Sequence, residues 1–291
     1  MRVTQRAVAA TSLQGLNRNL EQIGKLQQQL TSGRLISAPS DSPTGTNRAM
    51  QIRSTQAATE QQARAVADAK AWLEQTDSTL QTVIAHTQRV RDLTLQASND
   101  AMSPSARQAV AIEVESLREG LIALANTRSQ GRPLFGGATS GPAAYSPAGV
   151  YVGDAGAVNR RVSDDEVMAI NTTGPAAFGS GPDDLFGVVA SIATAVTTDP
   201  AQLSGHLQDL DEVMAGMLDA ISSVGVRGAR IEKLEQIGLD RSLALSSQLS
   251  EVENIDLPNT MMRLQMQQIG YETALAATAK AIQPTLLDFL R

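Results

Sequence analysis

Apolar side chains recur at helical spacing at both ends of the chain. Near the start they fall at Leu13, Leu16, Leu20, Ile23 and Leu30. Near the end the helical spacing continues to the last residues, at Ile269, Leu275, Ile282, Leu286, Leu287, Phe289 and Leu290. Domain termini are usually polar and loosely held, and apolar surface left in water is costly. We therefore expect the two ends to cover each other or to be covered by neighbouring copies, as in an assembly protein.

The composition favours a helical bundle and excludes several kinds of site. Aromatic residues make up only 3% of the 291 residues, with a single tryptophan at Trp72, whereas large globular cores rely on aromatic burial. The net charge is −6 without a lysine or arginine run, which argues against a nucleic-acid partner. Cysteine is absent, which excludes disulfides, thiolate catalysis and cysteine-bound metals. No apolar run of transmembrane length and no cleavable signal peptide is visible, so the chain is expected to be cytoplasmic or exported without a signal.

The spacing of apolar residues predicts two long helices in the first third of the chain. The first covers about residues 3–34. A defined loop follows, because prolines and turn-forming residues gather there, at Pro39, Ser40, Asp41 and Pro43. The second helix covers about residues 46–97. Heptad spacing along it predicts one buried face, at Val66, Ala69, Leu73, Thr76, Leu80, Val83, Thr87, Val90, Thr94 and Ala97.

The middle of the chain has a different pattern. From about residue 131 to residue 182, glycine and proline are dense and the helical spacing disappears. Short β-forming runs are expected to be strands there, at 149–153, 158–162 and 167–170. Helices are expected on both sides of this stretch, at about 104–127, from 184, after 200 and at about 259–283. Gly225 and Gly228 interrupt the heptad pattern, and Leu257-Pro258 is expected to break the chain again.

These elements predict a mainly α fold. It is expected to be a long antiparallel helical bundle or coiled coil, built from both chain ends, with a small β-rich inserted domain. The expected domains are a terminal coiled coil (1–42 and 258–291), a helical rod (43–135 and 183–257) and the β-rich insert (136–182).

Few residues are arranged for catalysis or for binding a ligand. His86 and His206 lie on separate predicted helices, and the acidic clusters lack the spacing of a calcium loop. No phosphate loop, zinc-protease or serine-hydrolase motif occurs, so no catalytic, cofactor or metal site is predicted. Asn171-Thr-Thr173 matches a glycosylation sequon, a pattern that is common by chance. Arg89 and Arg91 are expected either to fix the register of a neighbouring helix or to form a solvated salt-bridging face.

Several segments, taken in order, resemble motifs of the flagellin superfamily. Residues 32–46 (SGRLISAPSDSPTGT) are similar to its Ser-Gly-x-Arg/Lys-Ile…Pro-Ser-Asp-Asp-Pro-x-Gly-Ala stretch, and the prolines there are closest to those of hook–filament junction proteins, the third hook-associated protein family. Further similar segments are 88–99 (QRVRDLTLQASN), 124–137 (LANTRSQGRPLFGG) and 281–290 (AIQPTLLDFL). Ser42, where a second Asp is usual, and residues 257–259 depart from the family pattern.

The resemblance implies a fold, a location and a set of partners. Paired terminal helices would form an inner coiled-coil tube, with an outer helical rod and a β domain that faces outward. The chain would leave the cell through the flagellar type III export apparatus, without a cleaved signal, and become part of the extracellular flagellum. The implied partners are the first hook-associated protein, flagellin, further copies of the chain in a ring, and an export chaperone that binds the C-terminal region.

Two other interpretations stay open at this point. A small flagellin, the filament subunit, would share these motifs, although flagellins usually carry a Ser-Ala-Lys-Asp-Asp-Ala segment where this chain has Ser37-Ala-Pro-Ser-Asp41. Arg291 partly resembles the end of a flagellin. A cytosolic coiled-coil regulator with an enzymatic or binding insert would instead be a stable oligomer that is never exported. High abundance in sheared appendages would distinguish a flagellin from a junction protein. Export from the cell would distinguish either of them from a cytosolic regulator.

Overall fold

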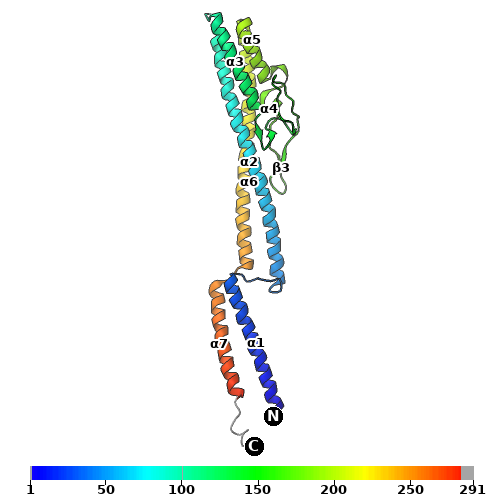
Figure 1. The fold of residues 1–291 in the computed structure, drawn as a ribbon, viewed down its shortest axis with the longest axis vertical. Coiled ribbons are helices and arrows are strands. Elements are labelled where there is room, and N and C mark those ends of the chain that lie inside the picture. The colour runs from blue at the N-terminus through cyan, green and yellow to red at the C-terminus, as the bar shows by residue number, and fades with distance from the viewer. Residues whose placement is uncertain (1, 100, 283–291) are drawn as a thin grey trace. The chain divides into compact units, whose positions relative to one another are not determined.

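The computed structural model describes residues 2–99 and 101–282, and Figure 1 shows that helices dominate them. The helices are α1 (Arg2–Ser32), α2 (Pro43–Ala97), α3 (Pro104–Ala125), α4 (Gly174–Phe178), α5 (Leu185–Thr198), α6 (Leu203–Glu253) and α7 (Leu257–Ile282). The strands are β1 (Arg128–Ser129), β2 (Arg132–Pro133), β3 (Asn159–Arg161) and β4 (Val167–Ala169), and short 3₁₀ turns lie at Gly181–Asp183 and Pro200–Gln202. The expected mainly α fold with a small β-containing insert is confirmed.

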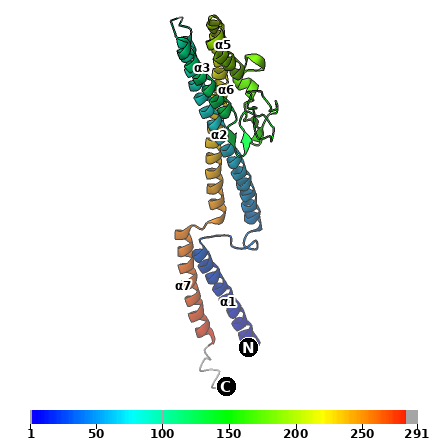
Figure 2. The ribbon, with the colours of Figure 1, turned by 45° about the horizontal axis from the view of Figure 1, so that its top comes forward.

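Contacts divide the chain into two compact units. We call residues 1–58 with 241–291 the terminal unit, and residues 59–240 the central unit. In the terminal unit α1 lies beside α7, as Figures 1 and 2 both show. In the central unit α3 packs against α5. The division into three domains that the sequence suggests stays a prediction.

The heptad face of α2 is buried as the spacing predicts. All ten of its positions, from Val66 to Ala97, lie in the interior of the central unit. Three of them are threonines, and each hydroxyl donates to the carbonyl four residues earlier: Thr76 to Trp72 (2.8 Å), Thr87 to Val83 (2.8 Å) and Thr94 to Val90 (2.7 Å). A buried hydroxyl without a partner is costly, so this local bond lets a polar residue occupy an apolar seam.

Some elements differ from the sequence prediction. The run 149–153 is not a strand, since it forms only an isolated bridge between Tyr145 and Tyr151. Helix α6 continues through Gly225 and Gly228 without a break, because its apolar positions stay packed on both sides of them. The helix break near Leu257-Pro258 lies slightly earlier, at residues 254–256, and the proline falls in the first turn of α7. Proline fits there because the first helical N–H groups have no partner inside the helix.

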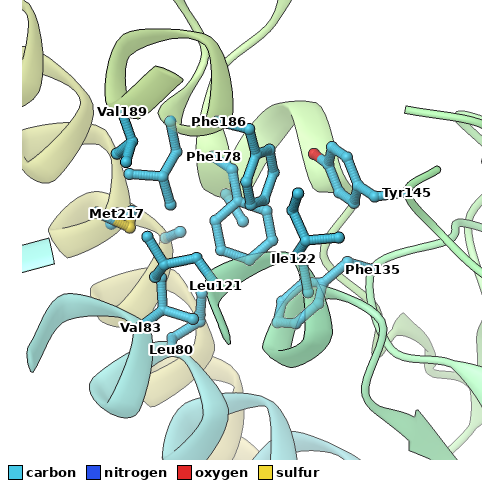
Figure 3. Packing of buried hydrophobic residues seen from close by; sticks show 14 of the residues in the cluster. Leu80, Val83, Leu121, Ile122, Phe135, Tyr145, Phe178, Phe186, Val189 and Met217 are labelled. Carbon is cyan, nitrogen blue, oxygen red and sulfur yellow. The ribbon is translucent and has the colours of Figure 1, made fainter. Parts of the chain in front are cut away.

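The few aromatic residues gather where the insert meets the helices. Figure 3 shows side chains of α2, α3 and α6 around them, at Leu80, Val83, Leu121, Ile122 and Met217. Phe178 lies edge-on to Phe135, with the ring centres 4.8 Å apart, and Tyr145 lies 4.7 Å from Phe186. Burial raises the pKa of the Tyr145 hydroxyl, and nearby Asp184 and Tyr151 add to the shift. The single tryptophan, Trp72, is also buried in the central unit.

Arg227 of α6 ties the insert to the helices. Its guanidinium donates to the carbonyl oxygens of Asn171 (2.8 Å) and Ala169 (3.2 Å) and to the hydroxyl of Thr172 (2.9 Å). Burial lowers the pKa of the Arg227 guanidinium. Nearby, Arg230 pairs with Glu166 at 2.8 Å on the surface. Arg227 and the aromatic core therefore help to hold the insert, together with Arg118 of α3, which donates to the Ala148 carbonyl at 2.7 Å.

The sequon asparagine is a structural residue. Asn171 is buried, and its side-chain oxygen accepts a hydrogen bond from the Val158 N–H at 2.8 Å. Its side-chain nitrogen donates to the Gly156 carbonyl at 2.9 Å. With both ends of the amide in use, this side chain holds the segment before β3 to the segment after β4, and is closed to modification in the folded chain.

Candidate assembly surface

Three of the predicted interface residues line the seam between α1 and α7. Leu16, Ile23 and Leu30 are half-buried there, and Leu26 continues the same face. The facing positions of α7 keep heptad spacing, at Thr260, Leu264, Gln267, Tyr271, Ala274 and Thr278. Within the seam the Gln267 amide donates to the Asn19 side-chain oxygen at 3.0 Å. The helix pair thus buries one face of each helix, with polar as well as apolar side chains.

The other predicted interface residues are not covered by the part of the chain that the structure describes. Leu13 and Leu20 of α1 are 56% and 47% exposed, and Ile269 and Leu275 of α7 are exposed to a similar degree. They are joined on α7 by exposed methionines, at Met261, Met262 and Met266. Each of the two helices therefore carries a second apolar face in addition to the seam.

The remaining predicted interface residues lie outside the part of the chain that the structure describes. Leu286, Leu287, Phe289 and Leu290 lie beyond residue 282, and Ile282 is the last residue of α7, with its side chain outside the description. The prediction that these residues contribute to assembly stays a prediction.

The predicted proline loop is an ordered structure built around Asp41. The Asp41 carboxylate accepts from the backbone N–H groups of Ser37 (3.1 Å) and Ala38 (3.0 Å) and pairs with Lys25 of α1 at 3.0 Å. The Lys25 hydrogen bond, followed by the two backbone bonds, lowers the pKa of the Asp41 carboxyl. Pro39 and Ser40 lie exposed at the turn, and Pro43 begins α2.

Ser42 caps helix α2. Its hydroxyl accepts from the Gly45 N–H at 3.1 Å, which is the bond that an N-cap residue makes with the third residue of a helix. Serine and aspartate are about equally good at this position. The departure of Ser42 from the family motif therefore leaves the helix start intact.

The two breaks in the helices are bonded to each other. The Leu35 N–H donates to the Glu253 carbonyl at 2.6 Å, and the Ile255 N–H donates to the Gly33 carbonyl at 3.1 Å. The Glu253 side chain is buried and pairs with Arg53 of α2 at 2.7 Å. We call these contacts the clasp. The sequence did not indicate Glu253 or Arg53, because their partners lie about 200 residues away along the chain.

The comparisons with known proteins agree with the sequence motifs. Residues 3–139 match the family model of the bacterial flagellin N-terminal helical region. Over 97% of this chain and 96% of its relative, the sequence is 28% identical to flagellar hook-associated protein 3 of Escherichia coli K12. The protein of the same name from Salmonella typhimurium LT2 is 24% identical over 94% of this chain and 95% of the relative. The chain is thus similar to flagellar hook-associated protein 3 along almost its whole length.

Solved structures support the fold of the chain. The crystal structure of Bacillus cereus FlgL is 26% identical, has a TM-score of 0.62, and aligns with 69% of this chain and 99% of its own. The structure of a putative flagellar hook-associated protein from Vibrio parahaemolyticus has a TM-score of 0.69 at 19% identity, covering 74% of this chain and 100% of its own, and it shows the fold alone. The resemblance to this family that the motifs suggested is confirmed.

Arg89 and Arg91 bond within the central unit. Arg89 pairs with Glu113 of α3 at 2.6 Å, and Arg91 pairs with Asp211 of α6 at 2.8 Å. The Asp211 hydrogen bond raises the pKa of Arg91. The two arginines join α2 to a helix on either side, with all four side chains partly exposed. Exposed pairs contribute little stability, and the expectation that the two arginines fix the register of a neighbouring helix stays a prediction.

The histidines and carboxylates form no reactive cluster in the described chain. His206 lies 3.5 Å from Asp209 on the same helix, and His86 lies between α2 and α3 close to Gly120. Across residues 2–99 and 101–282, no group of three histidines or carboxylates is placed to hold a metal ion. Within the same residues no helix combines the length and apolarity needed to span a membrane.

Proposed function

We propose that this protein is a structural adaptor of the bacterial flagellum that joins the hook to the flagellin filament. The observation that carries the proposal is the match to flagellar hook-associated protein 3 along almost the whole of both chains. The exposed second face of α1 and α7 supports it, because a protein that works as a link must bury such surface against its neighbours.

The proposed partners follow from this position. One side of a ring of copies contacts the first hook-associated protein, and the other side contacts flagellin. Self-association uses the uncovered faces of α1 and α7, together with the segment from Ile282 to Leu290. Such a chain acts by binding, without catalysis.

The proposed route leads out of the cell. The subunit is exported through the flagellar type III apparatus without a cleaved signal, and a chaperone covers its C-terminal region beforehand. The apolar residues of that region support this step, because exposed apolar segments associate non-specifically before assembly. The mature location is the extracellular flagellum.

A strain that lacks the gene tests the adaptor function. It is expected to build hooks, to release flagellin into the medium and to carry no filaments, and the intact gene should restore filaments. Normal filaments in the deletion strain would contradict the proposal.

A small flagellin is the second candidate, because the family model that matches residues 3–139 describes flagellin. Copy number separates the two functions. A junction protein is a trace component of sheared flagella, whereas a flagellin is their main protein. Quantitative mass spectrometry of sheared filaments decides between them.

A further inference from the structure

The methionines of the chain are divided sharply between the two units. In the terminal unit Met50, Met261, Met262 and Met266 are all about half exposed or more, up to 69% for Met266. In the central unit the described methionines pack against or within the core, at Met102, Met168, Met214 and Met217. Met217 is completely buried. Methionine is usually a core residue, and exposed methionines are typical of binding surfaces, so the exposed set indicates a contact surface in the terminal unit.

The exposed sulfurs on α7 lie on the uncovered apolar face. Met262, Met266 and Ile269 follow one another at steps of four and three residues, so their side chains form one stripe along the helix. Met266 also lines a shallow hollow of about 350 Å³ with Leu26, Lys25 and Arg263. That space admits a small oxidant directly to the sulfur.

We propose that Met262 and Met266 form an oxidation-sensitive site that controls the assembly of this subunit. Hydrogen peroxide transfers one oxygen atom to the thioether sulfur, which gives methionine sulfoxide and water. The sulfur is oxidised by two electrons and the peroxide O–O bond is broken and reduced. No other reactant is needed, and sulfoxide reductases can reverse the change.

The consequence for assembly follows from the polarity of the product. A sulfoxide is a polar group that accepts hydrogen bonds, so two of them on the α7 stripe turn an apolar contact surface into a hydrated one. Packing against a neighbouring subunit would then remove water from these oxygens without replacing their hydrogen bonds. This part of the inference rests on the proposed function, since it requires that the α7 face is buried on assembly.

Peptide mapping after mild peroxide treatment tests the site without any assembly. Dilute full-length protein is sampled over time, and each sulfoxide is found as a gain of about 16 Da on its peptide. Met262 and Met266 should oxidise several-fold faster than Met168, Met214 and Met217. Equal rates in the two units would overturn the proposal, because exposure would then not select the site.

Paired variants in the gene-deletion strain test the consequence. M262Q/M266Q places polar side chains of similar length on the stripe, whereas M262L/M266L keeps it apolar and cannot be oxidised. The leucine variant should restore filaments, even after peroxide exposure during growth, and the glutamine variant should lose them. M50Q is the matched control, an equally exposed methionine on α2 that should restore filaments.

The outcomes separate this inference from the proposed function. Full filaments with M262Q/M266Q would overturn the control of assembly and leave the adaptor function standing. If the intact gene itself restores no filaments, the adaptor function fails, and the peptide map still decides whether the site is oxidised selectively.

Discussion

Buried threonine is the unusual residue choice in the central unit. Thr76, Thr87 and Thr94 occupy positions of the α2 heptad that coiled coils usually give to leucine, isoleucine or valine. Each hydroxyl is bonded only within its own helix, so it adds no cross-helix contact. The sequence predicted these positions correctly because spacing, rather than side-chain type, decides which face of a helix is buried.

Replacing one of these threonines by valine should not weaken the central unit. Thr87→Val removes a hydroxyl whose bond competes with the helix's own bonding, and it adds an apolar methyl group in the same space. The free energy of unfolding should be unchanged or rise by up to about 1 kcal/mol in urea titrations followed by circular dichroism.

Thr82→Val is the matched control for this change. The Thr82 hydroxyl makes the same bond to the carbonyl four residues earlier, at 2.9 Å, but the side chain is exposed. Valine there should bring no gain from burial. A clear loss of stability in Thr87→Val, without one in Thr82→Val, would mean that the buried hydroxyl has a second role.

At the scale of elements, the connections decide which helices pair. The clasp joins the loop after α1 to the turn after α6, and Asp41 holds the same loop from within. Prolines and turn residues predicted both breaks, since proline fits a helix only in its first turn and so marks where one helix has ended and the next begins. That the two breaks bind each other could not be predicted, because the pairing depends on backbone groups with no sequence signature.

Removing the Asp41 charge should loosen the proline loop. Asp41→Asn loses the Lys25 ion pair and weakens the two backbone bonds, so proteases should cut between residues 33 and 42 more quickly. Because the folded pKa is lowered, the Asp41 contribution is fully present above the ordinary value of 3.8 and is lost as the pH falls through the lower folded value.

The loop's protection from proteolysis should therefore decline in the wild type only under strongly acidic conditions, as followed with an acid-active protease. Ser40→Ala, at the exposed tip of the same loop, is the control, and proteases should cleave it at the wild-type rate. If Asp41→Asn also resists cleavage at neutral pH, the loop is held by the clasp alone.

Arg227 is one of the anchors of the insert. Arg227→Met keeps most of the side-chain length but leaves the carbonyl oxygens of Ala169 and Asn171 without this donor. We expect a cost of about 2 kcal/mol, concentrated in the insert, because partly buried bonds to a charged donor are lost. Hydrogen exchange should speed up in residues 155–173 while α2 and α3 stay protected.

Arg230→Met is the matched control for the insert. Arg230 lies on the same helix and also reaches the insert, but its pair with Glu166 is on the surface. Its loss should change exchange in the insert much less. Equal effects of the two changes would show that the insert is held by charge and not by the buried hydrogen bonds. Sequence reasoning found the insert but not this anchor, since an isolated arginine on a helix has no distinguishing pattern.

At the scale of the whole molecule, the terminal unit carries two kinds of apolar face. Leu16 lies in the seam between α1 and α7, and Leu20 lies on the uncovered face one turn further along. The sequence placed both residues in a single stripe, because steps of three and four residues do not separate a seam within the chain from a surface for another chain. The packed helix pair makes that distinction.

Aspartate at Leu16 and aspartate at Leu20 should disturb different properties of the protein. Leu16→Asp puts a charge into the seam, so residues 1–58 of the isolated protein should become sensitive to protease. Leu20→Asp should leave protease resistance unchanged and still abolish filaments in the deletion strain. Gln14→Asp, an exposed polar position on α1, controls for the added charge and should retain both properties. Filaments in Leu20→Asp would remove that face from the assembly surface.

The position of Trp72 determines what optical measurements on this protein can report. The single indole is buried in the central unit, so its fluorescence follows the melting of that unit. Tyr271 is the aromatic residue that the described part of the terminal unit offers as a probe. Loss of the α1–α7 pair should therefore leave the tryptophan emission unchanged while helical circular dichroism falls. A fluorescence melt taken alone would record a fully folded protein after its terminal unit has come apart.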